Sequence, residues 1–251
     1  MTSWIAGSVS VRSIIVRDLG RTDYGVAHEL QRDLHRARSA GLAPDTLLLT
    51  EHSPVITLGR NQTTPDLRAP LHQIEALGIP IVQAERGGDI TYHGPGQLVV
   101  YGIIDLRGWA IGVVDYVAGL EEAATRALWA YGIAAGRRVG SRGCWVEGRK
   151  IASVGVHVSR GVTMHGIAIN VDLDLAPFDL INPCGLAGVQ MTSILRESES
   201  GPTMGEFGQA FVRAFGDVFG VETGLSARIE HARADPGADV AAAAGCPHPR
   251  E

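Results

Sequence analysis

Cysteine is scarce in this sequence. The three cysteines of its 251 residues, Cys144, Cys184 and Cys246, lie far apart, and no C-x-x-C pair occurs. This spacing argues against a disulfide framework and against a zinc site of the usual Cys/His kind. The nine histidines form no H-E-x-x-H motif, so the sequence predicts no metal site. We expect free thiols in the reducing environment of the cytoplasm.

Positive charge and long apolar runs are lacking as well. The formal net charge is −5, whereas proteins that bind nucleic acids in general are usually basic. No apolar run approaches the ~18 residues that a membrane-spanning helix needs. Residues 1–12 also lack the basic leader and apolar stretch of a secretory signal. We therefore expect neither nucleic acid nor a membrane among the partners.

Lysine is the rarest of the charged residues. Lysine and arginine total 22, yet Lys150 is the only lysine. One explanation for the single lysine is a general bias of this sequence towards arginine. In the other, position 150 needs an amine that can lose its proton, which a guanidinium group does not do.

Short apolar runs, separated by glycine, proline and polar residues, predict many strands. They cover residues 11–16, 47–49, 55–58, 79–82, 98–104, 144–147, 150–158 and 162–171. Gly148 and Arg149 fit a two-residue hairpin turn between the sixth and seventh of these. Because helices and strands mix without regular βαβ alternation, we expect a mixed α+β fold with largely antiparallel sheets and flanking helices.

Three longer segments have helical periodicity. The first, residues 23–40, should turn Val26, Leu30, Leu34 and Ala37 inward, and the second, residues 113–131, should bury Val113, Val117, Leu120, Ala124 and Leu128. The third, residues 203–219, begins with Thr203 and Glu206 at capping-box spacing and repeats phenylalanine every fourth residue. We expect one catalytic domain over residues 1–226 and a poorly ordered tail over residues 227–251, which lose all periodicity.

A glycine-rich segment lies between two predicted strands. It reads ERGGDITYHGPGQL and begins at Glu85. Glycine allows close backbone approach to a ligand, although an ordinary tight loop has the same composition. The segment matches neither the dinucleotide fingerprint nor the P-loop.

Two residues have the chemistry of a nucleophile and a base. On a regular strand Lys150 shares a face with Ala152, Val154, Val156 and Val158, and burial there favours the neutral amine that a base needs. Alternatively, its long stem reaches solvent beside the turn. Cys184 stands between Pro183 and Gly185, which suits a loop that presents a thiol, although an inert buried thiol is the other reading. Cys144, inside an apolar strand beside Trp145, reads as structural.

Four segments together resemble the lipoyl(octanoyl) transferases. They are LLLTEHSPVITLGR, ERGGDITYHGPGQLVVY, GRKIASVGVHVS and HGIAINVDLDLAPFDLINPCGL, and the resemblance covers residues 11–219. It implies the catalytic-domain fold of biotin and lipoate protein ligases, with Cys184 as the thioester-forming cysteine and Lys150 as the general acid and base. It also implies an acyl-binding set: Arg86, Gly87, Gly88, Asp89, Ile90, Thr91, Tyr92, His93, Ser153, Val154, Gly155, Gly166, Ile167 and Ala168.

The activity implied by this resemblance is the first step of protein lipoylation. An octanoyl or lipoyl group would pass from acyl carrier protein, through a Cys184 thioester, to a lysine of a lipoyl domain. Acceptors would be the lipoyl domains of 2-oxoacid dehydrogenases and the glycine cleavage H protein. No ATP or metal cofactor is expected, because conversion of a thioester to an amide is downhill.

Other activities remain open at this stage. An ATP-dependent lipoate or biotin ligase on the same fold is the main alternative, and a thioesterase, an amidase or a silent acyl-binding module are others. A cluster of six cations and one acid between Arg137 and Arg160, in a chain of net charge −5, suits an acidic carrier protein. A solvated surface with chance clustering would look the same.

Overall fold

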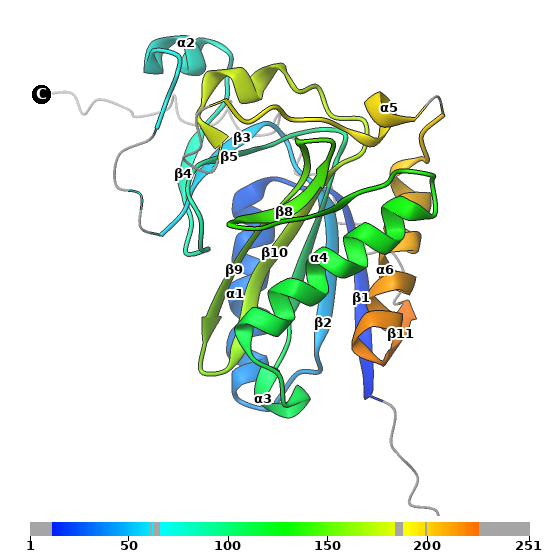
Figure 1. Ribbon diagram of the computed structural model, residues 1–251. Coiled ribbons are helices and arrows are strands. Elements are labelled where there is room, and N and C mark those ends of the chain that lie inside the picture. Colours follow the sequence, from blue (N-terminus) through cyan, green and yellow to red (C-terminus); the bar gives the residue numbers. More distant parts are fainter. Residues whose placement is uncertain (1–11, 61, 63–65, 184–187, 199, 226–251) are drawn as a thin grey trace, which may run out of the picture.

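Eight strands of the chain form one mixed sheet, with the order β11-β1-β2-β6-β10-β9-β8-β7 (Figure 1). A smaller sheet, in the order β4-β3-β5, lies beyond one end of it. The structure is a computed structural model that describes residues 12–60, 62, 66–183, 188–198 and 200–225. Cys184 and the predicted tail, residues 227–251, lie outside the described residues.

The strands and helices have the following bounds. The strands are β1 (Arg12–Arg21), β2 (Thr46–Glu51), β3 (Val55–Leu58), β4 (Ile81–Gln83), β5 (Thr91–His93), β6 (Gln97–Ile103), β7 (Gly136–Arg138), β8 (Ser141–Val146), β9 (Arg149–Ser159), β10 (Val162–Asn170) and β11 (Val221–Leu225). The helices are α1 (Tyr24–Ser39), α2 (Leu71–Ala76), α3 (Leu106–Trp109), α4 (Val113–Trp129), α5 (Ile194–Glu197) and α6 (Met204–Phe219), with a 3-10 turn, η1, at Ala176–Leu180.

The large sheet is covered on both faces. Helices α4 and α6 pack on one face, and α1 crosses the other (Figure 1). Strand β6 lies in the middle and is buried along its whole length: Leu98 and Val100 join the core under α4 and α6, and Val99 and Tyr101 join the one under α1. Alternation to both faces explains why this strand reads as a continuous apolar run.

The small sheet has a core of its own. Ile56 of β3, Ile74 of α2, Tyr92 of β5 and Phe178 of η1 pack together there, with the rings of Tyr92 and Phe178 edge to face at 5.7 Å. The strands β3 and β5 are antiparallel, and the chain between β4 and β5 is the glycine-rich segment. The small sheet therefore positions that segment over one end of the large one.

Each predicted strand and helix has a counterpart in the structure, and the mixed α+β fold with flanking helices is confirmed. The capping box is also present: Thr203 Oγ1 accepts a bond from the Glu206 N–H, and the Thr203 N–H donates to Glu206 Oε2 at 2.8 Å. Two apolar residues were placed wrongly. Val26 and Val113 are exposed, because α1 turns His28 and Gln31 inward and Val113 is the first residue of α4.

The hairpin turn between β8 and β9 also differs from the prediction. Val146 pairs with Arg149, so the two turn residues are Glu147 and Gly148, with φ angles of 46° and 85°. A left-handed pair matches the twist of the strands, which explains glycine at the second position. No helix in the described ranges is long and apolar enough to cross a membrane.

Candidate active site

A cavity lies on the α1 face of the large sheet, beneath the glycine-rich segment. Its walls are mostly apolar. Its walls come from α1, the segment between β4 and β5, and strands β6, β9 and β10: Tyr24, Arg86, Gly88, Asp89, Ile90, Thr91, His93, Val99, Tyr101, Ser153, Val154, Gly155, His165, Gly166, Ile167 and Ala168. A cavity of this polarity suits an apolar ligand.

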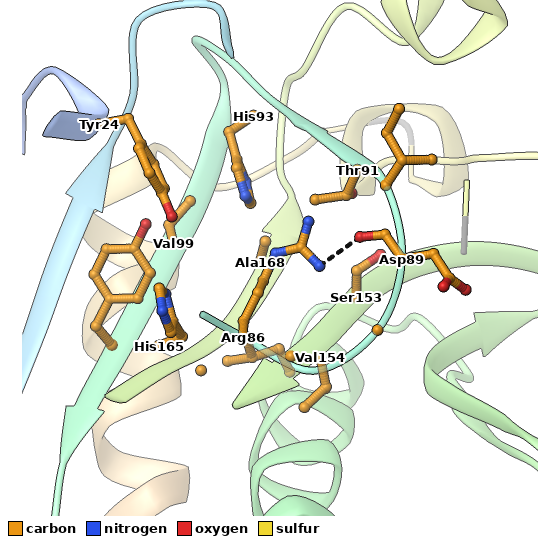
Figure 2. A pocket seen from close by; sticks show the side chains of 16 residues that line it. Tyr24, Arg86, Asp89, Thr91, His93, Val99, Ser153, Val154, His165 and Ala168 are labelled. Carbon is orange, nitrogen blue, oxygen red and sulfur yellow. Dashed lines mark hydrogen bonds between the residues drawn. The ribbon is translucent and has the colours of Figure 1, made fainter. Parts of the chain in front are cut away.

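The three predicted binding segments meet at this cavity. All of the predicted binding residues except Gly87 and Tyr92 line it. Figure 2 shows Asp89, Thr91, Ser153 and Val154 on one side and Tyr24, His93 and His165 on the other, with Arg86 between them. The Gly87 N–H instead donates to the carbonyl of Val156, and Tyr92 packs in the core of the small sheet.

Arg86 holds the glycine-rich segment in shape. Its guanidinium group is 8% exposed. It donates to the carbonyl of Thr57 at 2.6 Å, to the Thr57 hydroxyl at 2.7 Å, and to the carbonyl of Asp89 at 2.7 Å (Figure 2). The buried charge thus ties β3 to the loop, and its bonds to carbonyl oxygens fix where the following N–H groups point.

Gly155 lets this loop rest directly on strand β9. A Cβ atom at position 155 would come within 2.9 Å of the Gly87 carbonyl oxygen and 3.1 Å of Arg86 Cδ. On the next strand, a Cβ atom at Gly166 would meet the Val100 carbonyl oxygen at 2.2 Å. These two glycines are required by close backbone approach, which is one of the roles that the sequence suggested for glycine here.

Four cavity residues were not predicted: Tyr24, Val99, Tyr101 and His165. Burial raises the pKa of Tyr24 to about 12 and lowers the pKa of His165 to about 4. Both groups are therefore uncharged at neutral pH. A signal for His165 existed, since it precedes Gly166 in the quoted segment HGIAIN. The two tyrosines lie in α1 and β6, in patterns that indicate only packing.

A chain of hydrogen bonds runs from the cavity towards Lys150. The His93 Nδ1 and Gln97 Oε1 atoms are 2.7 Å apart, the Gln97 side chain donates to Asn170 Oδ1 at 2.9 Å, and Asn170 donates to the Thr192 carbonyl at 2.8 Å. The Thr192 N–H then donates to the Lys150 carbonyl at 2.9 Å. Burial lowers the pKa of His93 to about 3, so this chain carries no positive charge at His93.

A β-bulge decides which way Lys150 faces. Cys144 pairs with Ala152 and Trp145 pairs with Lys150, so one step along β8 corresponds to two along β9. Paired residues share a face and successive residues alternate. Cys144 and Ala152 lie in the core under α4 and α6, so Lys150 and Trp145 face the other way. The expectation that Lys150 shares a face with Ala152, Val154, Val156 and Val158 is wrong, because it assumed a regular strand.

The bulge turns Lys150 to the side of the sheet on which Ser153 meets the cavity. Its side chain is 2% exposed, so it does not reach solvent. The Nζ atom lies 5.3 Å from the centroid of the Trp145 ring, and Cε would lie 2.9 Å from a Cβ atom at Gly143. The Lys150 side chain is thus packed against the Trp145 ring, and its ammonium form makes a cation–π contact there.

The described residues on both sides of Cys184 are held in place. Before it, Asn182 donates through its N–H to the Asp66 carbonyl at 3.0 Å and through Nδ2 to Asp66 Oδ1 at 2.7 Å. After it, the Gln190 carbonyl accepts a bond from the Lys150 N–H at 2.8 Å. The chain that follows Cys184 thus returns to the backbone of Lys150.

Of the three cysteines, Cys144 lies within the described residues, and its surroundings indicate a structural role. It is fully buried and its thiol donates to the Glu121 carbonyl at 3.5 Å. Burial raises its pKa to about 12, so the thiolate is not available at neutral pH.

The predicted cluster of cations does not form one surface. Lys150 is buried, and Arg149 pairs with Glu197 at 2.9 Å and with Glu147 at 3.1 Å. Arg137, Arg138 and Arg142 remain exposed around a surface hollow that also includes Val139 and Ser141.

Comparison with known proteins covers most of the chain. Residues 23–216 match the lipoyl protein ligase A/B catalytic domain. An octanoyltransferase of Syntrophobacter fumaroxidans is 49% identical over 186 residues, which are 74% of this chain and 82% of that protein. An octanoyltransferase of Solibacter usitatus is 47% identical over 212 residues, which are 84% of this chain and 96% of that protein.

Solved structures resemble the fold at low sequence identity. A lipoate-protein ligase A bound with ATP superimposes with a TM-score of 0.68 at 16% identity, covering 86% of this chain and 88% of that one. A bi-partite lipoate protein ligase from Thermoplasma acidophilum gives 0.64 at 14% identity, covering 86% of each chain.

Proposed function

The chain belongs to the lipoyl protein ligase A/B catalytic-domain family, with octanoyltransferases as its curated relatives, and on that basis we propose that it is an acyltransferase acting in protein lipoylation. It moves an octanoyl group from a carrier-protein thioester to a lysine side chain of a lipoyl domain. The observation that carries the proposal is the meeting of the three predicted binding segments at one apolar cavity, on the side of the sheet that Lys150 faces.

The first half of the reaction forms a thioester on Cys184. Lys150 acts as the base that takes the thiol proton, and the thiolate attacks the thioester carbonyl of the donor. The bond between the carbonyl carbon and the donor sulfur breaks, and the departing thiolate takes the proton back from Lys150. Support comes from the buried position of Lys150 and from its backbone bond to Gln190, which follows Cys184 in the chain.

The second half transfers the acyl group to an amine. The acceptor lysine attacks the Cys184 thioester, an amide bond forms, and the Cys184 thiolate leaves. The proton lost by the attacking amine passes to the sulfur through Lys150. A thioester is already activated, so the proposed reaction uses neither ATP nor a metal cofactor.

The acyl chain occupies the apolar cavity in this proposal. Strands β9 and β10 run along the cavity. Ser153 of β9 pairs with Ala168 of β10, and this pair marks the end of the cavity that is nearer to Lys150 along β9. His165 pairs with Val156, so it stands roughly 10 Å further along the strand. Tyr24, Tyr101 and His165 therefore lie at the end where the tail of the acyl chain would stop.

The proposed partners are two proteins. The donor is octanoyl-acyl carrier protein, and the exposed guanidinium groups of Arg137, Arg138 and Arg142 support an acidic partner. The acceptors are lipoyl domains of 2-oxoacid dehydrogenases and the glycine cleavage H protein, as expected for the octanoyltransferases.

Intact-mass spectrometry after mixing with octanoyl-acyl carrier protein tests the proposal. The wild-type protein should gain the mass of one octanoyl group without ATP, and peptide mapping should place it on Cys184. Cys184→Ala should gain none. Cys144→Ala is the matched control and should still be acylated, because the Cys144 thiol is buried and protonated.

The same experiment separates the alternatives. Addition of a lipoyl domain should move the octanoyl group to its lysine as an amide. Release of free octanoate would indicate a thioesterase, and a strict need for ATP with free octanoate would indicate a ligase. An adduct mapped to Cys144 or Cys246 would contradict the assignment of Cys184.

A further inference from the structure

Three side chains of residue types that can bind metal ions meet beside the cavity, each from a separate element. They are His28 of α1, Glu85 of the segment after β4, and His165 of β10, and one ligand atom from each lies within 4.8 Å of the other two. His28 Nε2 is 2.6 Å from Glu85 Oε2, and His165 Nε2 is 3.7 Å from the same oxygen. The two imidazole rings are 5.4 Å apart between centroids.

Hydrogen bonds among the described residues do not explain why an imidazole is buried at His165. Its side chain is 1% exposed, yet neither ring nitrogen has a hydrogen-bond partner among the described residues. An unsatisfied buried imidazole is costly, and native proteins seldom keep one without a reason. Its backbone is also strained, with a φ angle of 59°. Strain of this kind concentrates at ligand-binding positions.

The surroundings fix the direction of the His165 ring. The backbone N–H of His165 donates to Oε1 of Gln31 in α1 at 2.9 Å, and the imidazole ring lies edge to face with the Tyr101 ring at 6.1 Å. The Tyr24 ring lies tilted against the His28 ring, with 5.4 Å between centroids. Both imidazoles are thus held by aromatic and backbone contacts, with their Nε2 atoms near one carboxylate oxygen.

Arg32 is the group that competes for this carboxylate. Its guanidinium donates to Glu85 Oε1 and not to Oε2. The oxygen that both histidines approach therefore remains available on the inner side. Half of the Arg32 side chain is exposed, so it can be displaced outwards at little cost.

We propose that His28, Glu85 and His165 form a binding site for a divalent transition-metal ion such as Zn²⁺. Two imidazole nitrogens and one carboxylate oxygen suit zinc, whereas magnesium and calcium prefer oxygen ligands throughout. Tetrahedral ligands with bonds of about 2 Å lie about 3.3 Å apart, and the two separations from Glu85 Oε2, 2.6 Å and 3.7 Å, lie on either side of that value. A solvent molecule would complete the coordination, since Glu85 is partly exposed.

In this proposal the ion stabilises the fold around the cavity and takes no part in the acyl transfer. It would link α1, β10 and the start of the glycine-rich segment, because Glu85 directly precedes Arg86. His165 lines the cavity at the end far from Lys150, so the bound ion would stiffen that wall. The inference depends on these three residues and not on the proposed acyl transfer.

Titration of the chelator-treated protein with Co²⁺ tests the site, with displacement by Zn²⁺. One Co²⁺ should bind per chain with the visible absorption of a four- or five-coordinate ion, and Zn²⁺ should raise the melting temperature. Glu85→Gln and His28→Gln, neither of which lines the cavity, should each weaken binding by at least about a hundredfold. His72→Gln, an exposed histidine on α2, is the matched control and should bind as the wild type does.

Three results would overturn the inference. One is the absence of stoichiometric binding, and another is binding that Glu85→Gln leaves intact. The third is an intense near-ultraviolet thiolate band, which would assign the ion to a cysteine instead. A His165→Asn variant adds a check, because asparagine tolerates a positive φ angle, and it should also lose the ion.

Discussion

The Lys150 side chain, 2% exposed above the ring of Trp145, occupies a space fitted to an amine. Gly143 lies against its Cε atom, where even a methyl group would crowd it. Its identity as a candidate was predictable, both from the resemblance and because it is the only lysine. Its direction was not, because that depends on a pairing irregularity with no mark in the sequence.

Replacement by arginine separates charge from proton transfer. Lys150→Arg keeps the positive charge, but a guanidinium stays protonated at any usable pH and is wider than an amine. We expect a folded protein whose single-turnover acylation is slower by at least about a hundredfold. Rates are measured by intact mass, with circular dichroism as the test of folding.

The neighbouring residue supplies the control. Arg149→Lys makes the opposite exchange one position away, at a side chain that pairs with Glu197 at the surface. It should acylate at close to the wild-type rate. Equal acylation rates in Lys150→Arg and the wild type would show that Lys150 supplies positive charge and does not transfer a proton.

Among the elements, the β8–β9 hairpin has the greatest influence on the site, through its bulge. Gly143 directly precedes the bulge: its φ angle is 108°, and a Cβ atom there would meet the Ala152 carbonyl oxygen at 2.1 Å. The Gly143 N–H also donates to the buried Glu121 at 2.7 Å. The sequence predicted both strands of this hairpin, but period-two alternation cannot indicate where an extra residue enters.

Gly143→Ala should therefore disturb the bulge. Strained backbone and contact with a carbonyl oxygen should lower the free energy of unfolding by at least about 2 kcal/mol. The measurement is urea denaturation at neutral pH. Gly136→Ala in β7 is the control, because its Cβ would have no neighbour within 4 Å, and it should change stability by less than about 0.5 kcal/mol.

If Gly143→Ala is as stable as Gly136→Ala, the backbone at 143 is not constrained as described. If it is destabilised but acylates normally while folded, the bulge supports the fold without directing Lys150.

Across the whole molecule, apolar runs predicted the central strands and the helices that cover them. The short strands β5, β7 and β11 were missed, since three to five residues carry little periodicity. The inward face of α1 was misjudged because it packs against the buried His165, where His28 and Gln31 replace apolar residues. The meeting of β6, β9, β10 and α1 at one cavity depends on strand order, which local patterns do not determine.

Burial of neutral histidines in that cavity makes the whole fold sensitive to acid. The His93 pKa is lowered to about 3, by burial first and then by His52, Arg86 and His165 nearby. The unfolded chain takes up a proton near pH 6.5 and the folded chain does not, so stability falls as pH drops from about 6.5 towards 3. The loss due to His93 is on the order of a few kcal/mol.

His93→Gln removes this titrating group. The variant should show a shallower fall in the free energy of unfolding between pH 7 and pH 4 than the wild type, measured by urea denaturation at each pH. The slope should not vanish, because the pKa values of His52 and His165 are lowered as well. An unchanged slope would mean that His93 is not buried in its neutral form.

Strand β1 pairs in parallel with β2 on one side and with β11 on the other, so among the described strands β11 covers the edge of β1 and forms that side of the large sheet (Figure 1). During synthesis, β1 and β2 leave the ribosome long before β11 and can pair early. The other edge of β1 stays unpaired while some two hundred further residues are made, until Val221–Leu225 emerge. An open strand edge recruits other chains. The edge of β1 is therefore open to association in the interval before β11 is made, and pairing with β11 covers it.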